Sequence, residues 1–191
     1  HYEMGLSLPS VAPSGQHDGG SESVWDLQSR YHVVERSVFT RDYNYRNAPE
    51  DMNLNINVSR GDSTTYGEAY HWADNYLAPG NRYQHTPDPE SGAFYARIRH
   101  ERYLNQQTRL SGETNCATLA PGQLLKVNGG EEVTEVWRRG VAITAIHCRA
   151  RRDRSFEVTF QAIPSVETYC FRPAIISKPK MAGTLPARVT S

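Results

Sequence analysis

One stretch near the end of the chain, residues 152–179, constrains the fold more than any other. It opens with apolar residues at every second position, the period of an extended strand with one buried face. The side chains that share this face are Phe156, Val158, Phe160 and Ala162. Pro164 then follows and ends the ladder, because proline has no N–H to donate. The stretch therefore predicts the last strand of a β domain, followed by an extended, proline-bounded connector.

Length and composition limit the class of protein. The 191 residues suffice for one domain, or for a large domain plus a linker. Hydrophobic residues make up 38% of the chain, which is low for an isolated globule and fits either a fragment or a protein whose second large surface is wet. The 21 Lys and Arg balance the 21 Asp and Glu, whereas a non-specific nucleic-acid binder carries a basic excess. No apolar run approaches the roughly 18 residues of a membrane helix, so we expect neither nucleic acid nor stable membrane insertion.

Motifs of known chemistry are missing from the sequence. The three cysteines, at positions 116, 148 and 170, show no CxxC spacing, and we interpret them as buried or partly buried thiols, with one disulfide as the alternative. The seven histidines include no HExxH pattern, and no GxSxG elbow, P-loop or GxGxxG fingerprint is present. We therefore predict no enzyme activity, no catalytic residue, no cofactor and no metal site.

Three clusters leave alternatives open. The basic residues in 149–154 form either a hairpin tip, ion pairs to a neighbouring subunit, or a nucleic-acid patch. The carboxylates of Asp42, Glu50 and Asp51 are either a solvated loop or a catalytic pair. An aromatic tract is either a core edge or subunit interface, or a surface that stacks on glycans. That tract consists of Tyr66, Tyr70, Trp72, Tyr76 and Tyr83.

The first half of the chain predicts loops, short strands and one helix. Residues 1–22 are rich in Ser, Gly and Pro and are expected to be a loop or linker. Strands are expected near 31–36 and 37–45, and the alternation over 53–58 is also typical of a strand. A helix is predicted near 91–107, with Ser91 as its N-cap.

Two faces are predicted for that helix. The expected buried stripe consists of Phe94, Tyr95, Ile98, Arg102 and Leu104. The expected opposite, solvent-facing side holds Arg97, His100, Glu101 and Asn105.

The second half predicts strands joined by hairpins. Strands are expected over 110–116, 124–127 and 136–149, with a break at 151–154 that folds the chain back onto the final strand. One helix among several strands with hairpin connections means an antiparallel β-barrel or a small α+β domain.

Seven short motifs, in this order, resemble the VgrG family, the spike and hub proteins of bacterial type VI secretion systems, which are akin to the baseplate hub of contractile-tailed phages. They cover roughly residues 22–191. The motifs are 22–27 (ESVWDL), 40–45 (TRDYNY), 78–83 (APGNRY), 96–99 (ARIR), 115–122 (NCATLAPG), 160–164 with 171–173 (FQAIP, FRP) and 183–189 (GTLPARV). The sequence departs from the family at Asn128-Gly129-Gly130, where a Gly-His-Pro-like turn is common.

The resemblance implies a fold and a domain plan. The fold would be mainly β, α+β, with an antiparallel β-barrel of phage-hub type, one prominent helix and a C-terminal connector to a missing OB-fold. Residues 1–22 would be a linker or the end of a first hub region. Residues 23–163 would form the second hub barrel, and residues 164–191 the connector and the start of the OB-fold.

The resemblance also implies a structural function. The chain would be a hub component that forms a homotrimer, caps the hexameric Hcp tube, contacts baseplate proteins and carries the spike, with effectors as possible cargo. It would assemble in the bacterial cytoplasm and be secreted into a target cell or the medium. A contractile phage baseplate hub of the same architecture and a carbohydrate-binding β domain remain the alternatives.

Overall fold

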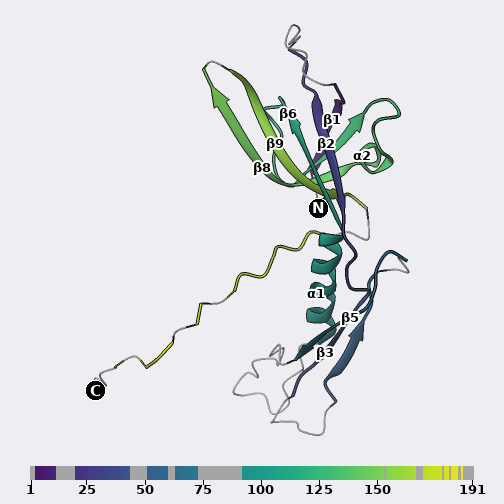
Figure 1. The fold of residues 1–191 in the computed structure, drawn as a ribbon, viewed down its shortest axis with the longest axis vertical. Helices are drawn as coiled ribbons and strands as arrows, with labels where there is room; N and C mark the ends of the chain where they lie inside the picture. Colours follow the sequence, from purple (N-terminus) through teal and green to yellow (C-terminus); the bar gives the residue numbers. More distant parts are fainter. Residues whose placement is uncertain are drawn as a thin grey trace.

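The chain folds into two lobes joined by a helix (Figure 1). The computed structural model describes residues 3–11, 20–43, 51–59, 63–72, 92–152, 154–166, 170–177, 179–180, 182–184 and 186. In these residues one lobe is a curled six-stranded sheet and the other a three-stranded sheet against a long helix. The elements are β1 (Glu3–Pro9), β2 (Val24–Tyr31), β3 (Ser37–Arg41), β4 (Asn53–Ile56), β5 (Glu68–Trp72), α1 (Gly92–Gln107), β6 (Thr108–Thr114), β7 (Gln123–Asn128), α2 (Glu135–Arg139), β8 (Val141–Arg151) and β9 (Arg154–Pro164).

The large sheet curls until its two edge strands meet. Its order is β1-β7-β8-β9-β6-β2, and all neighbours are antiparallel except β1 and β7. Ser10, just after β1, bridges to Val24 at the start of β2, and the Val11 N–H donates to the Val24 carbonyl at 3.0 Å. This bridge brings the two edges together at one end, so the sheet forms a partly closed barrel in which less backbone is left unpaired.

Local irregularities in the edge strands bend the sheet. Asp26 has a left-handed φ of 47°, and the register between β2 and β6 shifts between Trp25 and Gln28. Such a bulge adds local twist to a strand pair. At the other edge, a Cβ on Gly5 would overlap the backbone of Leu124, so β1 approaches β7 more closely there than any other residue allows.

The main core lies inside the curled sheet. Phe160 is fully buried and meets the ring of Trp137 edge-to-face, with ring centres 6.1 Å apart. A Cβ on Gly112 would come within 2.8 Å of the Phe160 ring, so the glycine leaves room for it. The remaining buried members of this cluster are Leu8, Val24, Leu110, Cys116, Leu119, Leu125, Val127, Val133, Val141, Ile143 and Ala162.

Several predictions are confirmed. The chain is mainly β, with a barrel-like sheet and one prominent helix, α1, at the predicted position. In β9 the predicted inner residues Val158, Phe160 and Ala162 are at most 1% exposed. The strand ends at Pro164, and the expected hairpin joins β8 to β9 through the pair Arg151 and Arg154.

Three element predictions are wrong. Residues 1–22 are not all linker, because Glu3–Pro9 pairs with β7 to form an edge of the barrel. The strand expected near 31–36 lies earlier, at Val24–Tyr31, where β6 supplies the hydrogen-bonding partner. The strand expected over 136–149 begins only at Val141, since the residues before it form α2 and turn Trp137 into the core.

Some predictions concern residues outside the described ranges. They include the N-cap at Ser91, the turn motif at 78–83 and most of the expected OB-fold start at 183–189. The domain boundaries after residues 22 and 163 stay predictions. Within the described residues, no helix combines the length and apolar composition that crossing a membrane requires.

We predict that Phe160→Asp lowers the free energy of unfolding by more than the roughly 3–5 kcal/mol typical of truncating a buried Phe, because a charge would enter the dry core. Chemical denaturation measures the change. Gln161→Asp is the matched control, since this neighbouring side chain is exposed on the other face of β9 and its replacement should change stability little. A larger loss of stability in Gln161→Asp than in Phe160→Asp would show that the strand faces are reversed.

Candidate functional site: an assembly scaffold

The junction between the lobes is continuous. Helix α1 ends at Gln107 and β6 begins at Thr108, with no residue between them. The helix packs against β3 and β4 of the small sheet, while β6 is an inner strand of the large one. A helix that passes directly into a core strand leaves little freedom for bending, so α1 acts as a stiff spacer that sets how the lobes are arranged.

His100 fixes the small sheet to this spacer. Its side chain is fully buried and reaches two other segments of the chain. The Val58 backbone N–H donates to Nδ1 at 2.9 Å, so Nε2 carries the proton and donates to the Glu35 carbonyl at 3.0 Å. Burial lowers the pKa of His100 below its ordinary value of 6.5, and the carbonyl and carboxylate of Glu35 and the carboxylate of Glu101 offset only part of this effect. The neutral imidazole thus joins α1, the segment that follows β4 and the loop before β3.

The predicted faces of α1 are therefore partly wrong. Leu104 is buried as expected, but Phe94, placed on the buried stripe, is 51% exposed. His100 and Asn105, placed on the solvent side, are 0% and 2% exposed. Hydropathy assigns polar residues to solvent, but here each of these two side chains is satisfied by backbone groups distant in sequence.

A second histidine lies at the same interface. His71 of β5 points toward α1, where its Nδ1 lies 2.9 Å from the Arg99 guanidinium and its Nε2 lies 2.9 Å from the Tyr103 hydroxyl. Because Arg99 can only donate, Nδ1 is the acceptor and Nε2 carries the proton. The imidazole also stacks on the Tyr103 ring. Polar contacts therefore hold α1 to both edge strands of the small sheet.

Four hydrogen bonds clasp the start of the connector to α1. Arg172 Nε donates to the Glu101 carboxylate at 2.6 Å, with both side chains less than a third exposed. The Asn105 side chain donates to the Cys170 carbonyl and accepts from the Arg172 backbone N–H. Arg102 Nε donates to the carbonyl of the following proline, at position 173. This clasp sets the place and direction in which the chain leaves the body.

The outer side of the small sheet carries aromatic side chains. Phe39 and Arg41 of β3 and Glu68, Tyr70 and Trp72 of β5 point away from α1, and we call these five residues the open face. Tyr70 and Trp72 are 58% and 55% exposed. Phe39 stacks on Tyr70 with ring centres 5.7 Å apart, and the Arg41 guanidinium lies 5.8 Å from the centre of the Trp72 ring.

This geometry bears on the two interpretations of the aromatic tract. One side of the Tyr70 ring and one side of the Trp72 ring are already covered by residues of β3. The other side of each ring stays exposed. The two interpretations, a core edge or subunit interface and a glycan-stacking surface, therefore stay predictions. Tyr66 is 82% exposed, and Tyr76 and Tyr83 lie outside the described residues.

Within the described ranges, the other residues singled out by sequence do not come together into a reaction centre. Cys116 is buried, but Cys148 and Cys170 are exposed free thiols, which corrects the expectation of burial. The Asp42 and Asp51 carboxylates accept from backbone N–H groups of their own loops, and Glu50 lies outside the described residues. The basic residues of 149–154 form the β8–β9 hairpin tip, as one alternative proposed. Among the described residues, no group of His, Cys, Asp and Glu is arranged to hold a metal ion.

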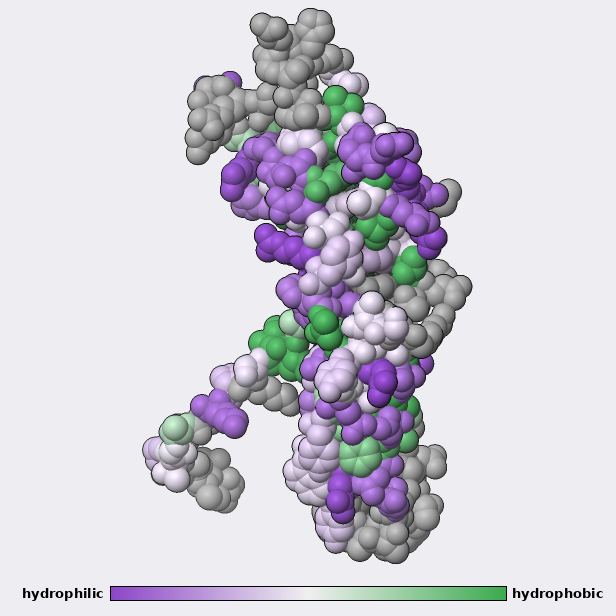
Figure 2. Space-filling view, turned by 45° about the vertical axis from the view of Figure 1, so that its right-hand side comes forward, coloured by the Kyte–Doolittle hydropathy of each residue, from purple (hydrophilic) through white to green (hydrophobic). Residues whose placement is uncertain are grey.

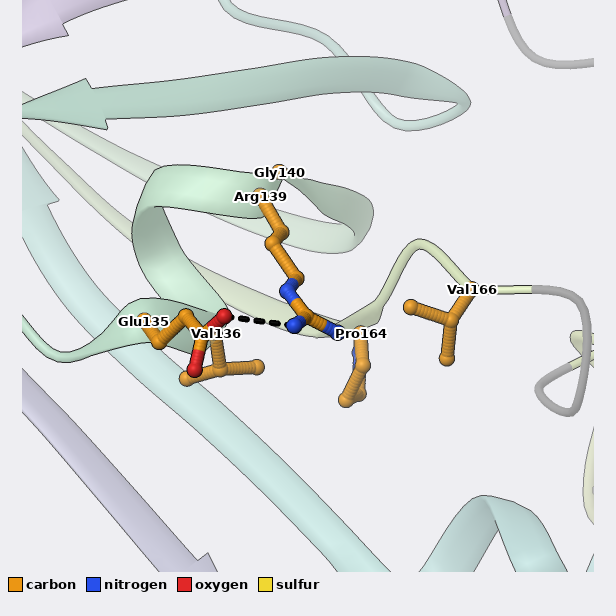
Figure 3. Close-up of a pocket in the computed structure, with 6 residues that line it drawn as sticks. All are labelled: Glu135, Val136, Arg139, Gly140, Pro164 and Val166. Atoms are coloured by element: carbon orange, nitrogen blue, oxygen red, sulfur yellow. Dashed lines mark hydrogen bonds and ion pairs between the residues drawn. The ribbon is translucent and has the colours of Figure 1, made fainter.

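A shallow pocket of about 250 Å³ lies between α2 and the chain that follows β9 (Figure 3). Val136, Pro164 and Val166 give it an apolar wall, and Arg139 and Glu135 form an ion pair at 2.5 Å along its rim. Its lining contains no nucleophile beside a base, so its chemistry suits an apolar side chain more than a reaction.

Comparisons with known proteins agree with a structural role for this fold. Residues 2–153 match the model of the phage tail baseplate hub (GPD) family, and the chain belongs to this family. Members of the family are structural components of a phage-type baseplate hub. No curated protein matches the chain.

Among solved structures, the chain is similar to an E. coli component of the type VI secretion system that exhibits structural similarity to the T4 bacteriophage tail proteins gp27 and gp5. The identity is 37% over 100% of this chain, with a TM-score of 0.56. The chain spans only 34% of the length of that protein. The resemblance to hub proteins of contractile injection machines is thus confirmed.

Two phage-type tail proteins share the fold. One is a tail protein from Neisseria meningitidis, with 7% identity, a TM-score of 0.53 and coverage of 82% of this chain and 43% of its own. The other is a 43 kDa tail protein of prophage MuSo2 from Shewanella oneidensis, with 10% identity, a TM-score of 0.51 and coverage of 85% and 43%.

We predict that His100 makes stability depend on pH. Above pH 6.5 the imidazole is neutral in both states, and its contribution is fully present. As the pH falls below 6.5, the unfolded chain binds a proton that the folded chain resists, so stability falls by up to about 1.4 kcal/mol per pH unit until the folded pKa is reached. Denaturant titrations of wild type and His100→Gln at a series of pH values measure how the free energy of unfolding depends on pH. The variant should lose the part of this dependence that His100 causes below pH 6.5. His147→Gln, at an exposed histidine, should keep it; a wild-type slope in His100→Gln would contradict the assignment.

We also predict that Glu101→Gln loosens the connector without unfolding the lobes, because it removes the charge that holds Arg172. Chymotrypsin should cut after Phe171 about tenfold faster, as expected when a charge-assisted bond contributing about 1.5 kcal/mol is lost. Glu135→Gln removes an i,i+4 ion pair between exposed side chains of α2, far from the connector in sequence, and should leave the rate unchanged. Unaltered cleavage of Glu101→Gln would show that the clasp does not hold the connector.

Proposed function

We propose that the chain is the hub part of a type VI secretion spike. The observation that carries this proposal is the 37% identity over the whole chain with an E. coli type VI component, against 7% and 10% for the two tail proteins. A baseplate hub needs stiff subunits rather than a pocket. The continuous α1–β6 junction and the clasp both supply such stiffness.

In this function the chain forms a homotrimer that caps the hexameric Hcp tube. The partly closed barrel supplies the ring, and the connector carries the polypeptide toward the spike, which delivers effectors. The directed exit of residues 170–173 from α1 supports this path. Assembly takes place in the bacterial cytoplasm, and the spike is then secreted into a target cell or the medium. The protein acts as scaffold and not as enzyme.

A phage baseplate hub is the second candidate. The shared fold of the Neisseria and MuSo2 tail proteins favours it, since their TM-scores are close to that of the E. coli protein. The two functions differ in the tube protein that the ring meets.

The full-length protein that contains this chain should be a trimer by light scattering at micromolar concentration, and it should co-sediment with Hcp tubes. Co-sedimentation with phage tail-tube protein and not with Hcp would favour the second candidate. A monomer that binds neither tube would contradict the hub function itself.

A further inference from the structure

The connector presents apolar side chains to solvent. We call residues 170–177 with 179–180 the connector arm; it is extended and forms no strand within the described residues. Figure 1 shows it running from the end of α1 away from both lobes, and Figure 2 shows hydrophobic surface where it leaves the body. Ile175 and Ile176 are 61% and 88% exposed. Two adjacent exposed isoleucines on an extended chain mark a segment suited to docking on another surface.

The open face of the small sheet is a second surface of this kind. Tyr70, Trp72 and Arg41 are the three residue types that dominate binding energy at protein interfaces. Pairing of Arg41 with Trp72 and of Phe39 with Tyr70 holds these side chains in fixed positions, so less conformational entropy is lost when a partner docks.

The arm cannot reach the open face of its own chain. The clasp fixes Arg172 to α1, and α1 covers the inner side of the small sheet, opposite to the open face. The four residues from Arg172 to Ile176 span at most about 14 Å when fully extended. The path would have to pass the helix, which is about 10–12 Å wide with its side chains, and then round the sheet edge. The two surfaces can therefore meet only between two copies.

The distance between an apolar and a charged side chain is the same on the connector arm as on β5 of the open face. Four residues separate Ile176 from Lys180 on the arm, and four separate Glu68 from Trp72 along β5. In extended chains both separations are about 13 Å. An arm that runs antiparallel to β5 thus places Ile176 against Trp72 and the exposed Lys180 beside the Glu68 carboxylate.

We propose that the connector arm of one copy docks on the open face of a second copy, with Ile176 against Trp72 and Lys180 beside Glu68. The contact is head-to-tail, because different surfaces of the two copies meet, and such a contact generates a closed ring when the rotation permits. The inference rests on the proposed homotrimer and names the surfaces through which its subunits meet.

A photo-crosslinking residue, benzoylphenylalanine, placed at Ile176 of the 191-residue chain tests the proposal. Mixing isotopically light and heavy chains distinguishes crosslinks between copies from those within one copy. We expect crosslinks between copies to the peptide with Tyr70 and Trp72, with a yield that rises with concentration. Crosslinks only within one chain, only to another surface, or none at any concentration that stays soluble would overturn the proposal.

Charge reversal supplies a second test with the same probe. Glu68→Lys and Lys180→Glu should each lower the yield of that crosslink about fivefold, the loss expected for an exposed ion pair replaced by like charges, and the double variant should recover it. Lys126→Glu, at an exposed lysine of β7 in the other lobe, is the matched control and should have no effect. If the double variant does not recover the crosslink yield, or if Lys126→Glu lowers the yield as much, the pairing of Lys180 with Glu68 is contradicted.

The outcomes separate this inference from the proposed function. If the full-length protein is a trimer that binds Hcp tubes but the crosslink forms elsewhere, the docking of the arm is wrong and the hub function stands. If the crosslink forms as expected but no tube protein binds, the docking stands and the hub function fails.

Discussion

The structure depends on the burial of a neutral imidazole between α1 and the small sheet. His100 holds α1 to the segment that follows β4 and to the loop before β3, and α1 continues without a break into β6. A charged group in this place would face the donated N–H of Val58 and a dry environment, so this contact requires the unprotonated ring. An apolar residue would fill the space but leave the N–H of Val58 and the carbonyl of Glu35 without their partner.

The described residues form a stiff framework rather than a small-molecule site. The barrel-like sheet closes on itself at Ser10 and Val24, the helix transmits its orientation, and the clasp around Arg172 fixes the exit of the chain. The pocket beside α2 is shallow and has no catalytic pairing in its lining. These features suit the structural role of a baseplate hub.

The fold leaves two apolar surfaces exposed, the open face and the connector arm, and both suit contacts in an assembly. Apolar side chains normally become buried, so an aromatic open face and a connector arm with two exposed isoleucines are costly for a chain that stays alone. Their positions on opposite sides of α1 prevent one from covering the other. The proposed docking between copies would bury both.

The sequence by itself determined the elements whose signals are local. The alternation in β9 predicts its inner face, the proline predicts its end, and the period of α1 predicts its length. The mainly β fold and the membership of a hub family also follow from residues in order. Failures of prediction occur where partners lie far apart in the sequence: β1 is defined by β7, and α2 is too short to show a helical period.

Only the tertiary structure decided which side of α1 is buried. His100 bonds to residues 42 and 65 positions away, and Asn105 to one 65 positions away. Hydropathy assigns both polar side chains to solvent, because it measures the cost of burial without the partners that remove it. The contacts of His100 and the clasp therefore follow from the tertiary fold, whereas the alternation of apolar residues along the strands already predicts the core of the barrel.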